Sequence, residues 1–351
     1  MSLWLEVETV ERNWDNFLKA ASLQPTYQIA VGFIAAGVWL PGLLGMSTLE
    51  YYNNHDQFMK ANLYLIERFP EAVWLPGFWV EFGTAAETSA FGAKVIFNED
   101  IPPSVLPITS KRILLESTRL PNPNTDGLLA LTLERYRQVE NQLSAIGLGV
   151  HMVASRGPLA ITAKLIGLER ALALLNKRDT HLLHFLDQLA VFVISWLQAQ
   201  IDQIRNPLGI LILDDVLGML AEEQFLEYGL PVMQSIFSRF EGLVRVFHND
   251  TPCTHLLPGL SEMDFEVLNF SHKMSIKRTQ ELIGSKVALL GNINQREVAA
   301  QGTSQQVREA ARECIRDGAG KPGLILSVSG ALYPGTPAEN IDAIIEAASS
   351  Y

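Results

Sequence analysis

Apolar and polar positions divide this chain into short apolar runs and longer segments with helical periodicity, which alternate from end to end. The short runs are continuously apolar, which is typical of parallel strands that are buried on both faces. The eight predicted strands cover residues 29–34, 72–75, 146–153, 209–213, 244–247, 265–270, 287–290 and 324–328. The predicted helices cover residues 13–23, 47–68, 126–143, 159–175, 181–204, 221–240, 275–283, 303–317 and 337–348.

This alternation predicts an α/β fold, a TIM barrel. Eight strands separated by helices are what a (β/α)8 barrel requires, and the helix at 13–23 precedes the first strand as an N-terminal extension. A doubly wound open sheet is the competing architecture, but no GxGxxG motif opens the first helix. Because no repeat, low-complexity tract or linker divides the sequence, we expect a single barrel domain over residues 1–351.

Composition and charge narrow the possible environments and partners. The chain is 48% hydrophobic and can bury a large core, while its net charge of −11 argues against nucleic acid as a partner. Its two cysteines are far apart, which predicts a reducing compartment and neither a disulfide framework nor a thiolate zinc site. Proline, glycine or polar residues interrupt the apolar stretches at 29–46 and 182–201. We therefore expect a cytoplasmic protein without a membrane span.

Carboxylates and a histidine follow two neighbouring predicted strands. Asp214 and Asp215 end the fourth strand, and His248 and Asp250 end the fifth. Since the carboxyl ends of barrel strands surround one mouth, these side chains are expected to meet there. Three interpretations stay open: a metal site with oxygen ligands, an acid–base pair in which an aspartate orients His248, and a hydrogen-bonded network without chemistry.

The ends of the other strands carry aromatic or polar residues. The ends of the first two strands and the loops after them carry four rings that predict an apolar wall for an aromatic substrate: Trp39, Trp74, Phe78 and Trp79. Polar residues at later strand ends include Arg156, Asn269, Asn292 and Ser329. Of these, Asn292 and Ser329 are candidates for hydrogen bonds to substrate or cofactor. Lys164 is expected to be a solvated or snorkelling helix lysine.

Several motifs together resemble the uroporphyrinogen decarboxylase superfamily. They are residues 85–93 (AAETSAFGA) with Pro102-Pro103, residues 157–167 (GPLAITAKLIG), Asp214 with Gly218, residues 291–293 (GNI) with Gly302-Thr303, and residues 333–341 (YPGTPAENI). Their order and spacing extend over roughly residues 12 to 350. The resemblance implies a (β/α)8 barrel independently of the strand count.

Departures from the decarboxylase pattern disfavour a porphyrinogen substrate. True decarboxylases have an arginine-rich loop after the first strand, whereas the loop at 35–41 contains no arginine. Gly83 and Lys164 stand at the positions of the family's aspartate and tyrosine. A tetra-acidic porphyrinogen would therefore meet an apolar wall on an acidic protein.

The methyltransferase branches of the superfamily match better, in part. The coenzyme M branch holds zinc with a His-x-Cys motif and a second cysteine, where this chain has His248-Asn249-Asp250 and Gly330. The methyltransferase I components of O-demethylases use two glutamates and a histidine. Glu227 and His248 have the spacing of the second glutamate and the histidine, and Ile212 stands in place of the first. The resemblance thus implies zinc bound by His248 and Glu227, with Asp214 or Asp215 as the nearest substitute, or Asp250.

The resemblance to O-demethylase components implies a specific function. Zinc would polarise the oxygen of an aromatic methyl ether, with His248, Asp250 and Asp214 as catalytic residues and Asp215 as a ligand. The methyl group would pass to cobalamin carried by a separate corrinoid protein. Alternatives are transfer from methylcobalamin to a thiol or folate, a metal-free decarboxylase with His248 or Lys164 as acid, and a silent corrinoid- or tetrapyrrole-binding protein. The oligomeric state is left open.

Overall fold

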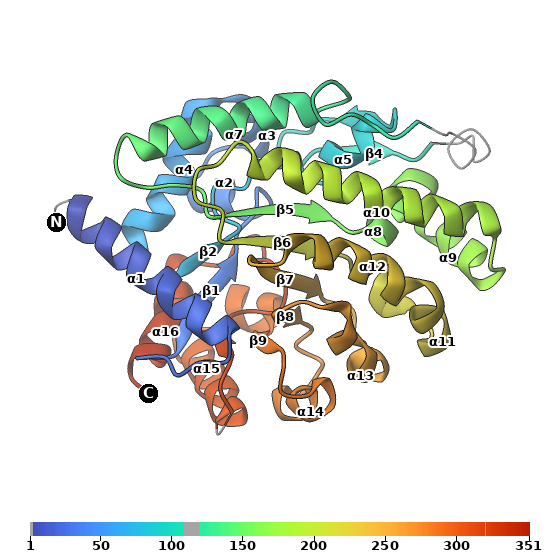
Figure 1. Cartoon of the computed structure of the whole chain (residues 1–351). Helices are drawn as coiled ribbons and strands as arrows, with labels where there is room; N and C mark the ends of the chain where they lie inside the picture. Colours follow the sequence, from blue (N-terminus) through green and yellow to red (C-terminus); the bar gives the residue numbers. More distant parts are fainter. Residues whose placement is uncertain (1–2, 109–118, 320) are drawn as a thin grey trace.

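A computed structural model describes residues 3–108, 119–319 and 321–351. Eight parallel strands form a near-closed barrel in the order β2-β1-β10-β9-β8-β7-β6-β5, with helices packed around it (Figure 1). The predicted α/β TIM barrel is therefore confirmed. The strands are β1 (Ala30–Ile34), β2 (Val73–Leu75), β5 (Met152–Arg156), β6 (Gly209–Leu213), β7 (Val244–Asn249), β8 (Val267–Phe270), β9 (Ala288–Leu290) and β10 (Leu324–Leu326).

Helices connect successive strands and cover the barrel. The α-helices are α1 (Leu3–Ala21), α2 (Leu40–Leu43), α3 (Thr48–Asn53), α4 (His55–Arg68), α5 (Ala85–Ala90), α7 (Leu129–Ser144), α8 (Pro158–Ile166), α9 (Leu168–Asn176), α10 (Thr180–Ile201), α11 (Glu222–Gln224), α12 (Leu230–Phe237), α13 (Leu257–Leu260), α14 (Ile276–Ile283), α15 (Ser304–Gly318) and α16 (Ala338–Ser349). Short 3₁₀ segments are η1 (Leu217–Met219), η3 (Ser238–Phe240), η4 (Thr254–Leu256) and η5 (Ser261–Met263). The π-helical segments are η2 (Phe225–Gly229) and η6 (Gln295–Ala300).

Local side-chain and backbone chemistry divides two of the predicted helices. The helix predicted at 47–68 is α3 followed by α4, because the Asn54 side chain accepts hydrogen bonds from the backbone of Asp56 and Gln57 and starts a new helix. The helix predicted at 159–175 is α8 followed by α9, with Gly167 between them at φ +90°. The irregular segment after β2 contains an antiparallel hairpin, β3 (Lys94–Ile96) and β4 (Ser104–Leu106).

Strand alternation separates the barrel interior from the layer beneath the helices. Along β6, Leu211 and Leu213 belong to the interior cluster, whereas Ile210 and Ile212 belong to the outer cluster that contacts the helices. Helix α1 joins the interior cluster through Trp14 and packs against β1, β2, β9 and β10. The predicted N-terminal extension therefore completes the barrel core.

Helix α10 contains the apolar stretch at 182–201, for which the sequence predicts no membrane span. It is the one helix in the described residues that is long and apolar enough to cross a membrane, and half of its most apolar window is buried inside the fold. Its buried side chains include Phe185, Leu189 and Trp196. This burial accounts for the apolar composition of the segment by packing within the protein.

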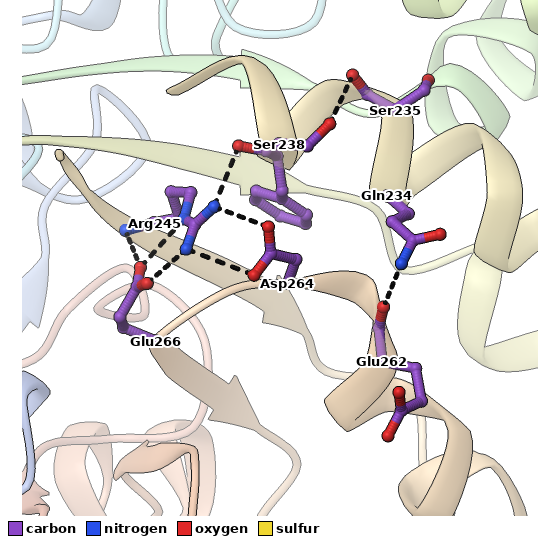
Figure 2. Close-up of polar contacts among 8 residues, drawn as sticks. Gln234, Ser235, Ser238, Arg245, Glu262, Asp264 and Glu266 are labelled. Atoms are coloured by element: carbon purple, nitrogen blue, oxygen red, sulfur yellow. Dashed lines mark hydrogen bonds and ion pairs between the residues drawn. The ribbon is translucent and has the colours of Figure 1, made fainter. Parts of the chain in front are cut away.

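A group of ion pairs around Arg245 joins the starts of β7 and β8. Figure 2 shows the Arg245 guanidinium between Asp264 and Glu266. Its Nη1 also donates to the backbone oxygen of Phe237 at 3.2 Å. Arg245 Nη1 lies 3.0 Å from Asp264 Oδ2, and the Arg245 backbone N–H donates to Glu266 Oε2 at 2.7 Å. These charge-assisted bonds fix the strand ends opposite the mouth, so we assign them to stability.

Candidate active site

His248 is the penultimate residue of strand β7, at the mouth of the barrel, and its side chain is buried. The register pairs it with Leu213 on β6 and with Asn269 on β8. All three side chains therefore point to the same face of the sheet, which is the barrel interior. Neighbouring strands thus bring the predicted histidine next to an amide that the sequence left without a role.

Asn269 determines which nitrogen of His248 carries the proton. Its Nδ2 donates to the carbonyl oxygens of Leu290 at 2.8 Å and Val328 at 3.2 Å, so its Oδ1 must face the other way. That oxygen lies 2.7 Å from His248 Nδ1 and also accepts the Gly330 backbone N–H at 3.1 Å. His248 Nδ1 is therefore the donor, and Nε2 of the neutral ring carries the lone pair.

The carboxylates of Asp215 and Asp250 lie on the Nε2 side of His248. Its Nε2 lies 3.4 Å from Asp215 Oδ1, and that same oxygen accepts the Asp250 backbone N–H at 2.7 Å. Asp250 accepts a further bond from Gln295 Nε2 at 3.1 Å. Burial, and then the charge of Asp215, raise the pKa of Asp250, while His248 and His272 oppose the increase. The three predicted residues do come together.

Asp214 also lies at the mouth of the barrel, directly after β6, but its carboxylate binds backbone N–H groups of the fold. It is fully buried and accepts the Leu159 backbone N–H at 2.9 Å, at the start of α8. Burial raises its pKa to about 7, against the lowering effect of the backbone N–H groups that face it. A Cβ atom at Gly157 would lie 2.3 Å from Asp214 Oδ2, so this carboxylate fills the space beside the glycine. The structure thus places the predicted catalytic Asp214 where it positions α8.

A cavity of about 390 Å³ opens in front of His248. It is bounded by the ends of β5, β6 and β7 and by α8, and its lining is Thr84, Arg156, Ala160, Ala163, Lys164, Leu168, Leu213, Asp215, Val216 and His248. Two of these are cations: Arg156, which the sequence placed at a strand end without a role, and Lys164, which it named only as an acid of the alternative decarboxylase. The cavity is therefore mixed in charge rather than an aromatic slot.

The predicted aromatic wall is divided between two layers. The neighbours of Trp74, Val73 and Leu75, lie in the barrel interior, so alternation turns Trp74 outward. There it stacks on Trp39 at 6.0 Å, and Trp39 Nε1–H donates to Thr336 O. Phe78 also packs in the outer cluster. None of the four predicted rings lines the cavity in front of His248 within the described residues.

Trp79 is the predicted ring that reaches the neighbourhood of this cavity. It belongs to the interior cluster, and the Arg156 guanidinium lies 4.9 Å from its ring centre. Its contact with the cavity is thus indirect, because it supports a cation that lines the wall.

Asn292 and Ser329 lie at the opposite side of the mouth and bind protein groups. Asn292 Nδ2 donates to the backbone oxygens of Ser271 and Met274 at 2.9 and 2.7 Å. Ser329 is fully buried, with its hydroxyl 3.2 Å from His272 Nδ1. Both bonds hold the loops after β8, β9 and β10 together, and a substrate role for either residue stays a prediction.

The zinc ligands named from the sequence are not assembled. Glu227 lies on η2 and forms an ion pair with Arg178 at 3.0 Å, on the helical segments that flank the mouth. His248 and Asp215 are close, but no group of three or more His, Cys, Asp or Glu side chains is placed to hold a metal ion in residues 3–108, 119–319 and 321–351. A catalytic zinc requires three protein ligands. The donor set as arranged does not fit that requirement.

A family model described as uroporphyrinogen decarboxylase (URO-D) matches residues 15–351. The chain belongs to the uroporphyrinogen decarboxylase family. It is 26% identical to the uroporphyrinogen decarboxylase of Danio rerio over 176 residues, 47% of this chain and 46% of that enzyme. It is 24% identical to a methylated-thiol–coenzyme M methyltransferase of Methanosarcina mazei over 191 residues, 54% of this chain and 50% of that enzyme. Each match thus spans about half of the relative.

A solved structure supports the same fold over nearly the full length. A methyltransferase from Methanosarcina mazei superposes with a TM-score of 0.80 at 21% identity, covering 95% of this chain and 97% of that one. The uroporphyrinogen decarboxylase family thus includes relatives of this chain that decarboxylate and relatives that transfer methyl groups. The site residues must decide between these chemistries.

Sequence reasoning did not predict how three residues contribute to the site. Asn269 and Arg156 were recognised as strand-end residues but received no role. Lys164 was expected to be solvated, and was named only as an acid of the alternative decarboxylase. The predicted strands could have indicated Asn269. It and His248 lie equally far from the first residues of their predicted strands, and the register pairs the two residues. Arg156 and Lys164 show their role only once β5 and α8 are packed together.

Proposed function

We propose that this protein is a methyltransferase that removes the methyl group of an aromatic methyl ether and passes it to the cobalamin of a separate corrinoid protein. The observation that carries the proposal is the setting of His248. It lies at a cavity of about 390 Å³, with Nδ1 committed to Asn269 and Nε2 directed to the side of Asp215. The relationship to methyltransferases supports the choice of reaction.

The proposed reaction requires a proton donor at the departing oxygen. The methyl–oxygen bond breaks, its electron pair stays on oxygen, and a proton converts the resulting phenolate to a phenol. The reduced corrinoid supplies the electron pair that takes up the methyl group. His248 takes up a proton from solvent at Nε2 and donates it from there to the oxygen, because the Nδ1–H is held by Asn269. Asp215, 3.4 Å from Nε2, stabilises the imidazolium before the transfer.

The family resemblance implies a more specific mechanism, in which zinc activates the ether oxygen. His248 Nε2 and Asp215 would supply two ligands, but a third is missing from the arrangement of the described residues. We therefore derive no step through zinc. Elemental analysis of purified protein tests the point: one tightly bound zinc per chain, lost in His248→Ala, would show that the ligand set is completed in a different arrangement.

The direct test of the proposed function is demethylation of methoxybenzenes in the presence of a reduced corrinoid protein. Phenol formation is followed by chromatography for wild type, His248→Gln and the control His184→Gln, which alters an exposed histidine on α10. General acid catalysis contributes about 10²–10⁴-fold, so we expect His248→Gln to lose at least about a hundredfold in rate and the control to lose none. Full activity of His248→Gln would exclude it as the proton donor.

A decarboxylase is the second candidate, and one observation favours it. Arg156 and Lys164 line the cavity, and cations of this kind can bind a carboxylate of an acidic substrate. Release of CO₂ from an aromatic or pyrrolic acid, without any corrinoid protein, would support this alternative. Methyl transfer without CO₂ release supports the first.

A further inference from the structure

Side chains that can bind metal ions gather around one carboxylate at the mouth of the barrel. The pKa of Asp250 responds to the charges of three neighbours: His248, Asp215 and His272. Two ligands at about 2.1 Å from a tetrahedral ion lie about 3.4 Å apart. His248 Nε2 and Asp215 Oδ1 have that separation, 3.4 Å. A third ligand would complete such a pair, and Asp250, whose backbone N–H donates to the same Asp215 oxygen at 2.7 Å, is the carboxylate placed beside it.

The Asp250 carboxylate is bound by Gln295 instead. Gln295 Nε2 donates to Asp250 Oδ2 at 3.1 Å. The amide has only one favourable orientation, because turning it over would set Gln295 Oε1 against the carboxylate as a second acceptor. Among the residues that the structure describes, Asp250 forms no ion pair with either nitrogen of His248. The carboxylate thus lies outside the distance at which it and His248 would share a metal ion.

Both ends of η6 hold Gln295 in this place. Gln295 is the first residue of the segment, and the Asn294 side chain accepts hydrogen bonds from the next two backbone N–H groups at 3.1 and 3.0 Å. At the other end, Asn340 Nδ2 donates to the backbone oxygens of Ala299 and Gly302, at 2.9 Å each. The segment is therefore fixed against α16, and the Gln295 side chain starts from an anchored backbone.

Gly330 leaves the space that the Gln295 amide fills. A Cβ atom on this glycine would lie 2.7 Å from Gln295 Oε1 and 3.5 Å from Asp250 Oδ2. The backbone is held there, because Asn269 Oδ1 lies 2.7 Å from His248 Nδ1 and also accepts the Gly330 N–H at 3.1 Å. A φ of +70° further favours glycine. A side chain at this position would push the amide off Asp250.

We infer that Gln295 is a positioning residue that keeps the barrel mouth free of a bound divalent metal ion, because it holds Asp250 away from His248 and Asp215. To become a ligand, Asp250 would have to break this hydrogen bond and leave the Gln295 amide without its acceptor. That loss lowers the affinity for zinc by about tenfold to a hundredfold. This role of Gln295 does not depend on which substrate the cavity takes, and it leaves His248 Nε2 open for the proton of the proposed reaction.

Metal binding to the purified chain tests this role directly. Zinc affinity is measured by competition with a chromophoric chelator, and cobalt(II) in place of zinc reports the ligand geometry by visible absorption. Gln295→Leu removes the amide at nearly the same size, and Gly330→Ala displaces it. The control Gln301→Leu alters an exposed glutamine just past the other end of η6.

We expect Gln295→Leu and Gly330→Ala to bind zinc at least about tenfold more tightly than wild type, whereas Gln301→Leu matches wild type. The cobalt forms of the first two should absorb intensely, as four-coordinate cobalt does. Adding Asp250→Asn to Gln295→Leu should abolish the gain, because the released carboxylate is the third ligand. If Gly330→Ala does not fold, Gln295→Leu with its Asp250→Asn partner carries the test alone.

Three results would overturn the role of Gln295. They are tight, stoichiometric zinc binding by wild type, an affinity of folded Gln295→Leu equal to that of wild type, and a gain that survives Asp250→Asn. The proposed function is judged separately. Demethylation by a wild type that binds zinc tightly would contradict the role of Gln295 and keep the proposed function. A gain of zinc affinity in Gln295→Leu, with no demethylation by wild type, would do the reverse.

Discussion

The hydrogen bond between His248 and Asn269 makes a prediction about the proton on the histidine ring. In Asn269→Ala, His248 Nδ1–H and the Gly330 backbone N–H both lose their acceptor in a fully buried location. Asn269→Asp keeps both of those acceptors but can no longer donate to the carbonyls of Leu290 and Val328. The two variants therefore separate the control of the tautomer from general damage to the core.

The expected loss of stability follows from the orphaned groups. A buried polar group without a partner costs about 1–3 kcal/mol, so two such donors predict about 2–5 kcal/mol of destabilisation in Asn269→Ala after partial relief by water. Unfolding entropy of about 2.1 cal/mol/K per residue amounts to roughly 0.7 kcal/mol/K for this chain length. The melting temperature should thus fall by about 3–7 °C.

The assay is a long-range ¹H–¹⁵N correlation spectrum of histidine-labelled protein at about pH 9, where histidine rings are ordinarily neutral. The signal of His248 is identified by its absence in His248→Gln. We expect the Nδ1–H form in wild type and in Asn269→Asp, and a mixture of both forms in Asn269→Ala. The reasoning is refuted if wild-type His248 carries its proton on Nε2, or if Asn269→Ala melts at the wild-type temperature.

Three further perturbations test the scaffold. Arg245→Met leaves two carboxylates and a carbonyl without their cation (Figure 2). Because both carboxylates are partly solvated, we expect the free energy of unfolding to fall by about 2–3 kcal/mol in chemical denaturation. The control Arg239→Met, at an exposed arginine, should change it little. Burial raises the pKa of Asp214 to about 7, so the folded state holds a proton more tightly than the unfolded state. Wild type should therefore lose stability relative to Asp214→Asn, by on the order of 4 kcal/mol, as pH rises from about 4 to about 7. A stability difference that is independent of pH would contradict this. Gly157→Ala forces a methyl group against Asp214 and should lower the melting temperature, whereas Gly42→Ala, with open space around its Cβ position, should not.

The interior-facing positions show how far local pattern reaches. The eight apolar runs were long and continuous enough to be recognised as buried strands, and the polar residues that follow them marked the mouth. A continuous apolar run, however, carries no signal for which residues face inward, since both faces are buried. Trp74 was therefore expected at the mouth, although its neighbours Val73 and Leu75 take the interior positions. Only the pairing of the strands determines which of their residues face the barrel interior.

The ligand prediction for Glu227 shows a different limit. Its distance along the chain from His248 suited a metal motif, but a spacing of this kind does not specify what other charges lie nearby. In the folded chain η2 lies beside the end of α9, and Arg178 pairs with Glu227 there. Arg156 and Lys164, which line the same cavity, come from two elements that are adjacent only after β5 and α8 have packed.

The sequence by itself determined the barrel, its family and the place of His248 at the end of a strand, because each depends on residues whose pattern or motif is local. The tertiary structure alone decided the partners of that histidine. Asn269 and Asp215 are distant along the chain and meet His248 through the register of β6, β7 and β8. Hydrogen bonds and ion pairs act over a few ångströms, so the protonation of His248 and the charge of its cavity are properties of the fold.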